Sequence, residues 1–382
     1  VREAATRAFK NCGGADLPLL ELYANLAQQY FDGNESLIAF PNEATNNVWS
    51  FDPFVGLSPL PVPTAIYPRI MAMKTSVRAV EIDPNNADAL ATFVASNLKR
   101  ENDLPEGAAD PVFGSLQYSP EFYATVYGTN TCMRVLGMGI DKLDTPLTRD
   151  AIAALSETTG GSNLFATPGR APLLEAINYP DRRVQYEAAL TLANALPQQT
   201  FNGDNAVVPV LASAVRMGSQ SLAIVIADDQ ENRTQTIADL EKLNFKVVGS
   251  GGSVAEVQPD IAGAVGVDLV VIRMRGAEEA RTALNALGSI PKTSAAPALV
   301  IASATDLPSL RLDVRDNPRV HAVRAGTAPD AMAAAVEQVM LRGAGGRITD
   351  AEAEEYAIRS LGAVRDVAIS RCPGYNIADA ET

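Results

Sequence analysis

The spacing of apolar residues changes near residue 221. Beyond this point, short apolar runs alternate with stretches in which apolar residues recur every three to four positions. Short apolar runs are typical of buried strands, and the longer spacing is typical of amphipathic helices. The strands are expected at residues 222–227, 246–249, 268–272, 299–302 and 320–323, and the helices at 233–243, 254–265, 277–287, 307–312 and 329–341. This alternation predicts a five-stranded, doubly wound parallel α/β sheet.

The rest of the chain is predicted to be helical, apart from one segment. Helices are expected at residues 1–9, 17–30, 67–82, 87–98, 120–141, 146–158, 172–178, 184–196 and 206–215, and again after 349. In the segment 36–63, two runs rich in aromatic and β-branched residues (37–40 and 47–51) flank a turn-rich connection and predict a β-hairpin. Four prolines at 53, 59, 61 and 63 are then expected to keep the chain extended.

The predicted fold class is therefore multidomain, α plus α/β. A helical domain is expected over residues 1–218, with the hairpin at about 36–63. An α/β domain is expected over 219–342. A C-terminal helical segment, 343–382, is expected to return to the helical body.

Three phrases in the helical part are similar to known repeats. AVEIDPNNADAL at residues 79–90 resembles the junction between TPR units, where one helix ends before a proline and the next begins at an Asn or Asp cap. VREAA at residues 1–5 and PLLEAIN at 172–178 resemble HEAT helices, although Val184 is followed by Gln185 and not by the usual arginine. The resemblance implies helix pairs that stack and present an extended protein-binding surface.

The order of elements in the α/β part resembles the receiver domain of response regulators. In that family two acids after strand one bind Mg²⁺, and an aspartate at the end of strand three accepts phosphate. A hydroxyl residue ends strand four and a lysine ends strand five. Here Asp228 and Asp229 match the acidic pair, and Ser303 matches the hydroxyl. In the strand-three phrase VDLVVIRMRG, Arg273 stands where the acceptor aspartate belongs, and Arg324 is nearest to the lysine position.

Arg273 changes the chemistry that the resemblance implies. An arginine cannot act as the nucleophile, and its positive charge opposes binding of Mg²⁺. The module is therefore expected to be a pseudo-receiver that is not phosphorylated. We expect the Arg273 guanidinium to pair with Asp228 or Asp229 and to replace the metal. The alternative is that Arg273 points into solvent and the two acids only cap the following helix.

The charge of the chain bears on possible partners. The chain has 31 basic and 45 acidic residues, a net charge of −14, which disfavours nucleic acid and anionic lipid surfaces. No apolar run reaches the roughly 20 residues that span a bilayer. Near the C-terminus, Thr349 and Glu352 have the spacing of a capping box, and Glu352, Glu354 and Glu355 are expected to form a solvated helix face.

The residues that usually carry catalysis are sparse. The single histidine, His321, lies in a predicted strand and is expected to be structural, which excludes His-based triads and multi-His metal sites. Cys12, Cys132 and Cys372 form neither a metal motif nor a disulfide framework. Gly249–Gly252 lacks the spacing of a phosphate-binding loop and is expected to be a turn. We therefore expect no enzymatic activity, no cofactor and no metal.

Two functions remain open at this stage. The first is a non-catalytic scaffold that binds other proteins, with Trp49 and Phe51 as possible contact residues, unless Trp49 packs the hairpin onto neighbouring helices. The second is a signalling module that senses a small ligand near Asp228, Gly249 and Ser303, at the carboxyl ends of the strands. The chain begins without a methionine, so an upstream segment is expected. The cytoplasm is favoured, and an extracytoplasmic location stays open.

Overall fold

The computed structural model describes residues 17–105, 107–111, 118–158, 170–197, 199–315, 317–370 and 375. The chain divides into two compact units, Val1–Val135 and Leu136–Thr382, and each is described by itself. The helix expected at residues 1–9 lies outside the described residues, as do Cys12 and Cys372.

In the described part of the first unit, α3 packs against both α2 and α4. These are α2 (Leu19–Phe31), α3 (Tyr67–Ile82) and α4 (Ala87–Asn102). Asn86 caps α4, because its side-chain oxygen accepts the N–H of Ala89 at 2.8 Å. The next helix, α5 (Pro120–Asp141), is interrupted at Gly128, where φ is 78°. Positive φ favours glycine, which has no Cβ to clash with the backbone.

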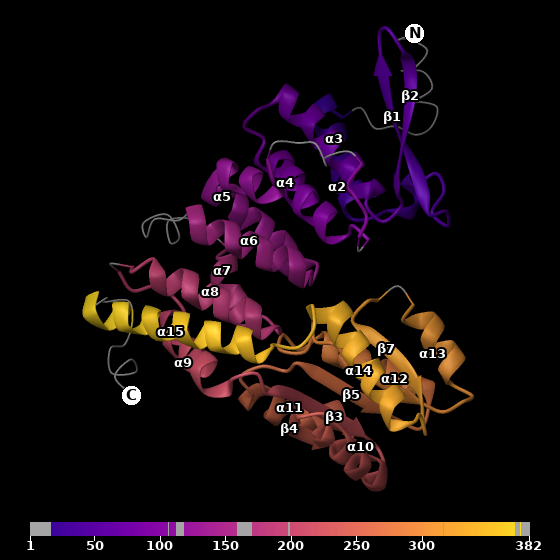
Figure 1. Ribbon diagram of the computed structural model, residues 1–382, viewed down its shortest axis with the longest axis vertical. Coiled ribbons are helices and arrows are strands. Elements are labelled where there is room, and N and C mark those ends of the chain that lie inside the picture. The colour runs from indigo at the N-terminus through magenta and orange to yellow at the C-terminus, as the bar shows by residue number, and fades with distance from the viewer. Residues whose placement is uncertain are drawn as a thin grey trace. The chain divides into compact units, whose positions relative to one another are not determined.

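The hairpin also belongs to the first unit, but its strands differ from those predicted. It consists of β1 (Thr45–Asp52) and β2 (Gly56–Pro63), which pair antiparallel (Figure 1). The strand expected at 37–40 is wrong, because residues 35–37 form a 3₁₀ turn instead. The proline-rich stretch that was expected only to be extended is the second strand. Prolines are tolerated on an edge strand, where no backbone N–H is required.

Five helices of the second unit flank its sheet in the sequence. They are α6 (Thr145–Thr158), α7 (Pro172–Ala176), α8 (Arg182–Asn194), α9 (Val207–Met217) and α15 (Asp350–Ser370). The last of these, α15, packs against both α8 and α9 (Figure 1). The boundary expected at residue 218 marks the change from helices to strands. The compact units instead divide at residue 135, so α6 to α9 belong with the sheet.

The sheet has five parallel strands in the order β4-β3-β5-β6-β7. The strands are β3 (Ser221–Ala227), β4 (Phe245–Gly251), β5 (Leu269–Arg273), β6 (Ala298–Ala302) and β7 (Val320–Arg324). The predicted five-stranded parallel sheet and its separation from the hairpin are confirmed. Every residue of β3 is buried, as expected for a central strand covered on both faces.

Helices cover both faces of this sheet, which gives two separate cores. On one face lie α11 (Val254–Gly263), α12 (Ala277–Gly288) and α13 (Leu307–Asp313). On the other face lie α10 (Gln230–Lys242) and α14 (Pro329–Ala344). Among the residues that the structure describes, no helix is long and apolar enough to cross a membrane.

Candidate functional site

The acidic pair follows β3, at the carboxyl edge of the sheet. Asp228 accepts the backbone N–H of Arg275 at 3.3 Å, and its carboxylate lies 3.4 Å from the Nε of the same arginine. Asp229 instead caps α10, accepting the N–H of Glu231 at 3.2 Å. One acid is therefore neutralised by an arginine after β5, and the other holds a helix N-terminus.

The expected pairing of Arg273 with the acids is wrong. Neither Asp228 nor Asp229 forms an ion pair with Arg273 in the described part of the chain. The reason is the alternation of side chains along β5. Val271 contributes to the core under α10 and α14, so Arg273, two residues later, faces that side too. Arg275 lies beyond the strand end and reaches Asp228 instead.

The other residues predicted to form the receiver-like site make local contacts. The Ser303 hydroxyl lies 2.6 Å from the carboxylate of Asp306 and accepts the Asp306 N–H at 3.2 Å, which stabilises the turn before α13. Arg324 ends β7 and is exposed. Its carbonyl accepts the Thr327 hydroxyl at 2.6 Å. All these residues lie at one edge of the sheet, but these contacts do not join them into one constellation.

The glycine-rich segment 249–252, which forms the end of β4 and the residue after it, makes room for α11. A Cβ on Gly249 would lie 2.5 Å from the Cβ of Asp260, so a larger residue would collide with that helix. The Gly252 N–H donates to the carboxylate of Glu256 at 2.7 Å, so it is not free to bind a phosphate. The expected turn is wrong for residues 249–251, because β4 continues to Gly251 and only Gly252 follows the strand.

A cavity of about 320 Å³ opens between α10 and α14, on the face to which Arg273 belongs. Its other polar side chains include Asp239, to which Gln235 and Lys242 donate at 3.0 Å. Burial alone would raise the pKa of Asp239. The Gln235 and Lys242 hydrogen bonds and the field of Arg273 outweigh this effect, so the pKa is lowered.

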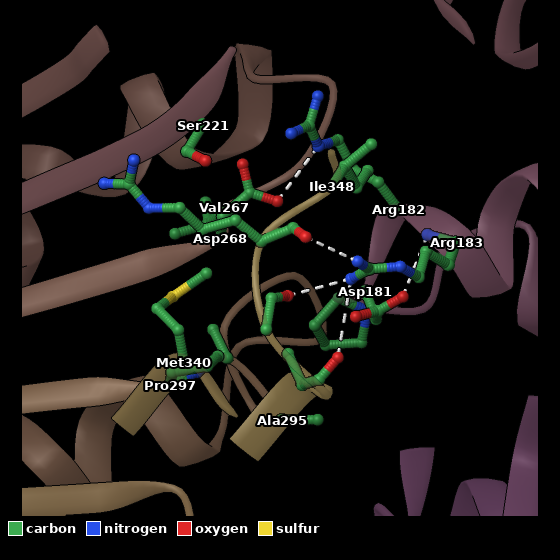
Figure 2. A pocket seen from close by; sticks show the side chains of 15 residues that line it. Asp181, Arg182, Arg183, Ser221, Val267, Asp268, Ala295, Pro297, Met340 and Ile348 are labelled. Carbon is green, nitrogen blue, oxygen red and sulfur yellow. Dashed lines mark hydrogen bonds and ion pairs between the residues drawn. The ribbon is translucent and has the colours of Figure 1, made fainter. Parts of the chain in front are cut away.

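A second site, which sequence reasoning missed, joins α8 to the sheet. The Arg182 side chain is 1% exposed, its Nε donates to Asp268 at 2.9 Å, and its Nη2 donates to the carbonyl of Gln220 at 3.0 Å. Asp268 also accepts the N–H of Leu222 at 2.6 Å. Figure 2 shows Arg182 and Asp268 facing each other across this junction. The cavity lined by these residues has a volume of only about 10 Å³, close to the lower limit for one water molecule, so the junction is tightly packed.

The neighbouring Arg183 joins α8 to the start of α15. Its guanidinium forms a bidentate pair with Glu352 at 2.9 Å and donates to the carbonyls of Gly346 and Arg347 at 2.9 and 2.7 Å. Hydrogen bonding from Arg183 lowers the Glu352 pKa to about 2. The expected capping box is present, since Glu352 also accepts the Thr349 N–H at 3.1 Å. The expectation that Glu352 belongs to a solvated face is wrong.

Two other residues considered in the sequence are withdrawn from solvent, His321 partly and Cys132 almost completely. Burial, with Arg311 and Arg342 nearby, lowers the pKa of His321 and favours its neutral form. Burial raises the pKa of the Cys132 thiol to about 11, which disfavours the reactive thiolate. Within the described residues, no group of three or more His, Cys, Asp or Glu side chains is placed to hold a metal ion.

The hairpin exposes an apolar face. Trp49 and Phe51 lie opposite Pro59 and Leu57, so these four side chains share one face of the ribbon. Trp49 is 52% exposed and Phe51 74%. The opposite face carries Val48 and Val62, which are buried against Ile66, Tyr67 and Ile70. The alternative in which Trp49 packs onto the helices is therefore wrong, because Val48 takes that place.

The tip of the hairpin is also apolar, and it is held in place. Phe54 is 98% exposed and Val55 77%. The Asp52 side chain accepts the N–H groups of both residues, at 2.7 and 3.0 Å, and so fixes the turn that carries them. The exposed side chains of Phe54 and Val55 thus lie on a defined turn and not on a free loop.

Comparison with protein-family models, curated proteins and solved structures yields no match to this chain.

Proposed function

We propose that this chain is a non-catalytic scaffold that binds a protein partner through the exposed face of the β1–β2 hairpin. The observation that carries the proposal is that both faces of the ribbon are apolar, the exposed face as well as the buried one. Its buried contacts come from Val48 and Val62, whereas its free face holds Trp49, Phe51 and Leu57. A soluble hairpin ordinarily turns its apolar face inward and its polar face outward. Aromatic side chains on a rigid, exposed element are typical of binding hot spots.

The partner is expected to contact side chains and not to extend the ribbon by strand addition. Pro59 and Pro61 lie on β2 and have no N–H, so that edge lacks donors for a new strand. On β1, the carbonyl of Trp49 accepts the Lys74 ammonium at 3.2 Å. Both edges are therefore hindered, and the apolar face is the accessible surface.

Charge favours a protein partner over a membrane or nucleic acid. Residues 41–66 contain two acidic side chains, Glu43 and Asp52, and no basic one. A surface of this kind repels phosphate backbones and anionic headgroups. An uncharged apolar patch on the partner is the complementary surface.

The remaining parts of the proposal concern the scaffold itself. We infer that the helix pairs α3–α4 and α7–α8 are of TPR and HEAT type. The caps at Asn86 and Asp181, which occupy the positions expected from the resemblance, support this inference. We infer that the α/β module is a phosphorylation-incompetent pseudo-receiver. The strand order β4-β3-β5-β6-β7, that of flavodoxin-like doubly wound sheets, and Arg273 at the acceptor position support it.

The test replaces the cross-strand pair with Phe51→Ser and Leu57→Ser together. The matched control is Val126→Ser, which removes an apolar residue that is 62% exposed on α5 of the same unit. Each variant is used to capture proteins from the source organism. Proteins that bind the wild type and the control but not the double variant are then purified and titrated with each of the three. We expect the dissociation constant to rise at least about tenfold in the double variant only.

Three outcomes contradict the proposal. The first is a partner that binds the double variant as tightly as the wild type. The second is the absence of any partner that distinguishes the double variant from the control. The third is hairpin-dependent binding to neutral phosphatidylcholine vesicles with no protein partner, which would assign the face to a membrane surface.

A further inference from the structure

The cavity between α10 and α14 has an apolar interior. Its apolar side chains come from the sheet and from both helices: Val271, Leu299, Ile301, Leu240, Leu243, Met332 and Val336. Its volume of about 320 Å³ is at the lower end of the range for small-molecule sites, roughly 300–1,000 Å³. The cavity thus accommodates the apolar body of a small molecule.

The polar groups around this cavity leave one charge uncompensated. Lys242 and Asp239 form an ion pair at 3.0 Å. The hydroxyl of Thr236 donates to the carbonyl of Asn232 at 2.7 Å, and Thr327 is likewise bonded within its own turn. Arg273 is half-buried and, within the described part of the chain, forms neither an ion pair nor a side-chain hydrogen bond. Asp239 acts on Arg273 only through its field, and with Lys242 already paired to Asp239 these three side chains leave one net positive charge at the cavity. A half-buried guanidinium that makes no hydrogen bond of its own is a binding group for an anion.

Beyond the scaffold function, we propose that this cavity binds a small amphipathic anion, an aryl or branched-chain carboxylate, whose carboxylate pairs with Arg273. The planar guanidinium can donate two parallel hydrogen bonds to a carboxylate. The apolar walls accommodate the rest of the molecule. A polyphosphate does not fit this description, because only one cation is free and the other lining groups are apolar or already paired.

The residue that departs from the receiver pattern is thus the one that binds the ligand. Arg273 pairs with Ala227 of β3 at the carboxyl ends of these strands, so the ligand would lie at the edge where Asp228 contacts Arg275, but on the face covered by α10 and α14. We thus place the ligand on that face and not at the position near Asp228, Gly249 and Ser303 that the sequence suggested.

The experiment uses the full chain and two probes, 2-naphthoate and its neutral counterpart 2-naphthylmethanol, with calorimetric titration. We expect 2-naphthoate to bind, and to bind more tightly than the alcohol. Arg273→Met should weaken 2-naphthoate binding at least about tenfold and leave alcohol binding nearly unchanged, because only the charge-assisted bonds are lost. Arg275→Met is the matched control, since this arginine lies at the same sheet edge but is 81% exposed, and it should bind 2-naphthoate like the wild type.

Two further variants guard against other interpretations. Met332→Trp fills the cavity and should abolish binding of both probes, with circular dichroism used to check that the fold is retained. The Phe51→Ser, Leu57→Ser variant should bind 2-naphthoate normally, which excludes the hairpin as the site. The proposal is overturned if 2-naphthoate does not bind, if Arg273→Met binds it as tightly as the wild type does, or if binding is lost with the hairpin residues.

Discussion

The Arg183–Glu352 pair provides a quantitative test of how α15 is held on the rest of its unit. Glu352→Gln keeps the shape of the side chain but removes its charge. Arg183 is 5% exposed and would keep its bonds to the carbonyls of Ala344, Gly346 and Arg347 and a weaker bond to the amide. A buried arginine that loses its counter-ion destabilises the folded state.

The magnitude is bounded by the pKa of Glu352, which Arg183 and, to a smaller extent, the hydrogen bonds of Thr349 lower from 4.5 to about 2. A shift of this size corresponds to about 3 kcal/mol at full strength. Because 35% of the Glu352 side chain is exposed, solvent screening reduces this value, and we expect a loss of about 1–2 kcal/mol in the free energy of unfolding.

The pH dependence has a definite sign. The folded-state pKa of Glu352 is depressed, so its stabilising contribution is full above about pH 4.5 and is lost as the pH falls towards 2. The difference in stability between the wild type and Glu352→Gln should therefore be largest at neutral pH and shrink between pH 4.5 and 2. Glu355→Gln serves as the control, because its partner Arg359 is 3.4 Å away and the Glu355 side chain is 66% exposed.

Urea unfolding followed by far-UV circular dichroism measures this effect. Tryptophan fluorescence is unsuitable, because Trp49 is the only tryptophan and belongs to the other unit. Two results would show that the ion pair does not hold α15. One is equal stability of Glu352→Gln and Glu355→Gln at pH 7. The other is a difference in stability between the wild type and Glu352→Gln that does not shrink as the pH falls from 4.5 to 2.

Two further predictions concern the α/β module. If it is the pseudo-receiver proposed above, incubation with acetyl phosphate and Mg²⁺ should leave the protein unmodified by mass spectrometry, because Arg273 would replace the acceptor aspartate and Asp228 is already paired. A gain of one phosphate at these strand ends would refute this. Gly249→Ala should lower the free energy of unfolding by about 1–3 kcal/mol, because its Cβ would collide with Asp260. Gly263→Ala, which meets no atom within 4 Å, should be neutral or stabilising in the same urea titration, and equal effects of the two substitutions would contradict the steric argument.

The periodicity of the sequence determined the α/β module almost completely. All five strands were located within a few residues, because a strand buried on both faces is a continuous apolar run, such as Leu222–Ala227. The residues that cap the helix N-termini could also be identified from the sequence. Asp181 follows Pro180 at the start of α8, a position typical of a cap residue, and its carboxylate accepts the N–H groups of Arg183 and Val184. Such signals are local, so a single sequence contains them.

The hairpin shows where local signals are insufficient. The two apolar runs 37–40 and 47–51 both have the composition of strands, whereas the prolines in the stretch 53–63 are unfavourable for a strand. Residues 56–63 form the second strand because they pair with β1, and this is possible because Pro59 and Pro61 can face a free edge. The sequence singled out Trp49 and Phe51, but their exposure depended on which face Val48 and Val62 would bury.

Only the tertiary structure decided which charged groups meet. Arg273 and Arg275 are both near a strand end, and side-chain alternation together with the position of α10 directs one to the cavity and the other to Asp228. Arg182 and Arg183 lie 86 and 169 residues from Asp268 and Glu352, and nothing in their spacing marks them as partners. Charged side chains make such contacts wherever the packing of apolar surfaces brings them together. Periodicity therefore predicts the elements, and the packed fold determines the ion pairs.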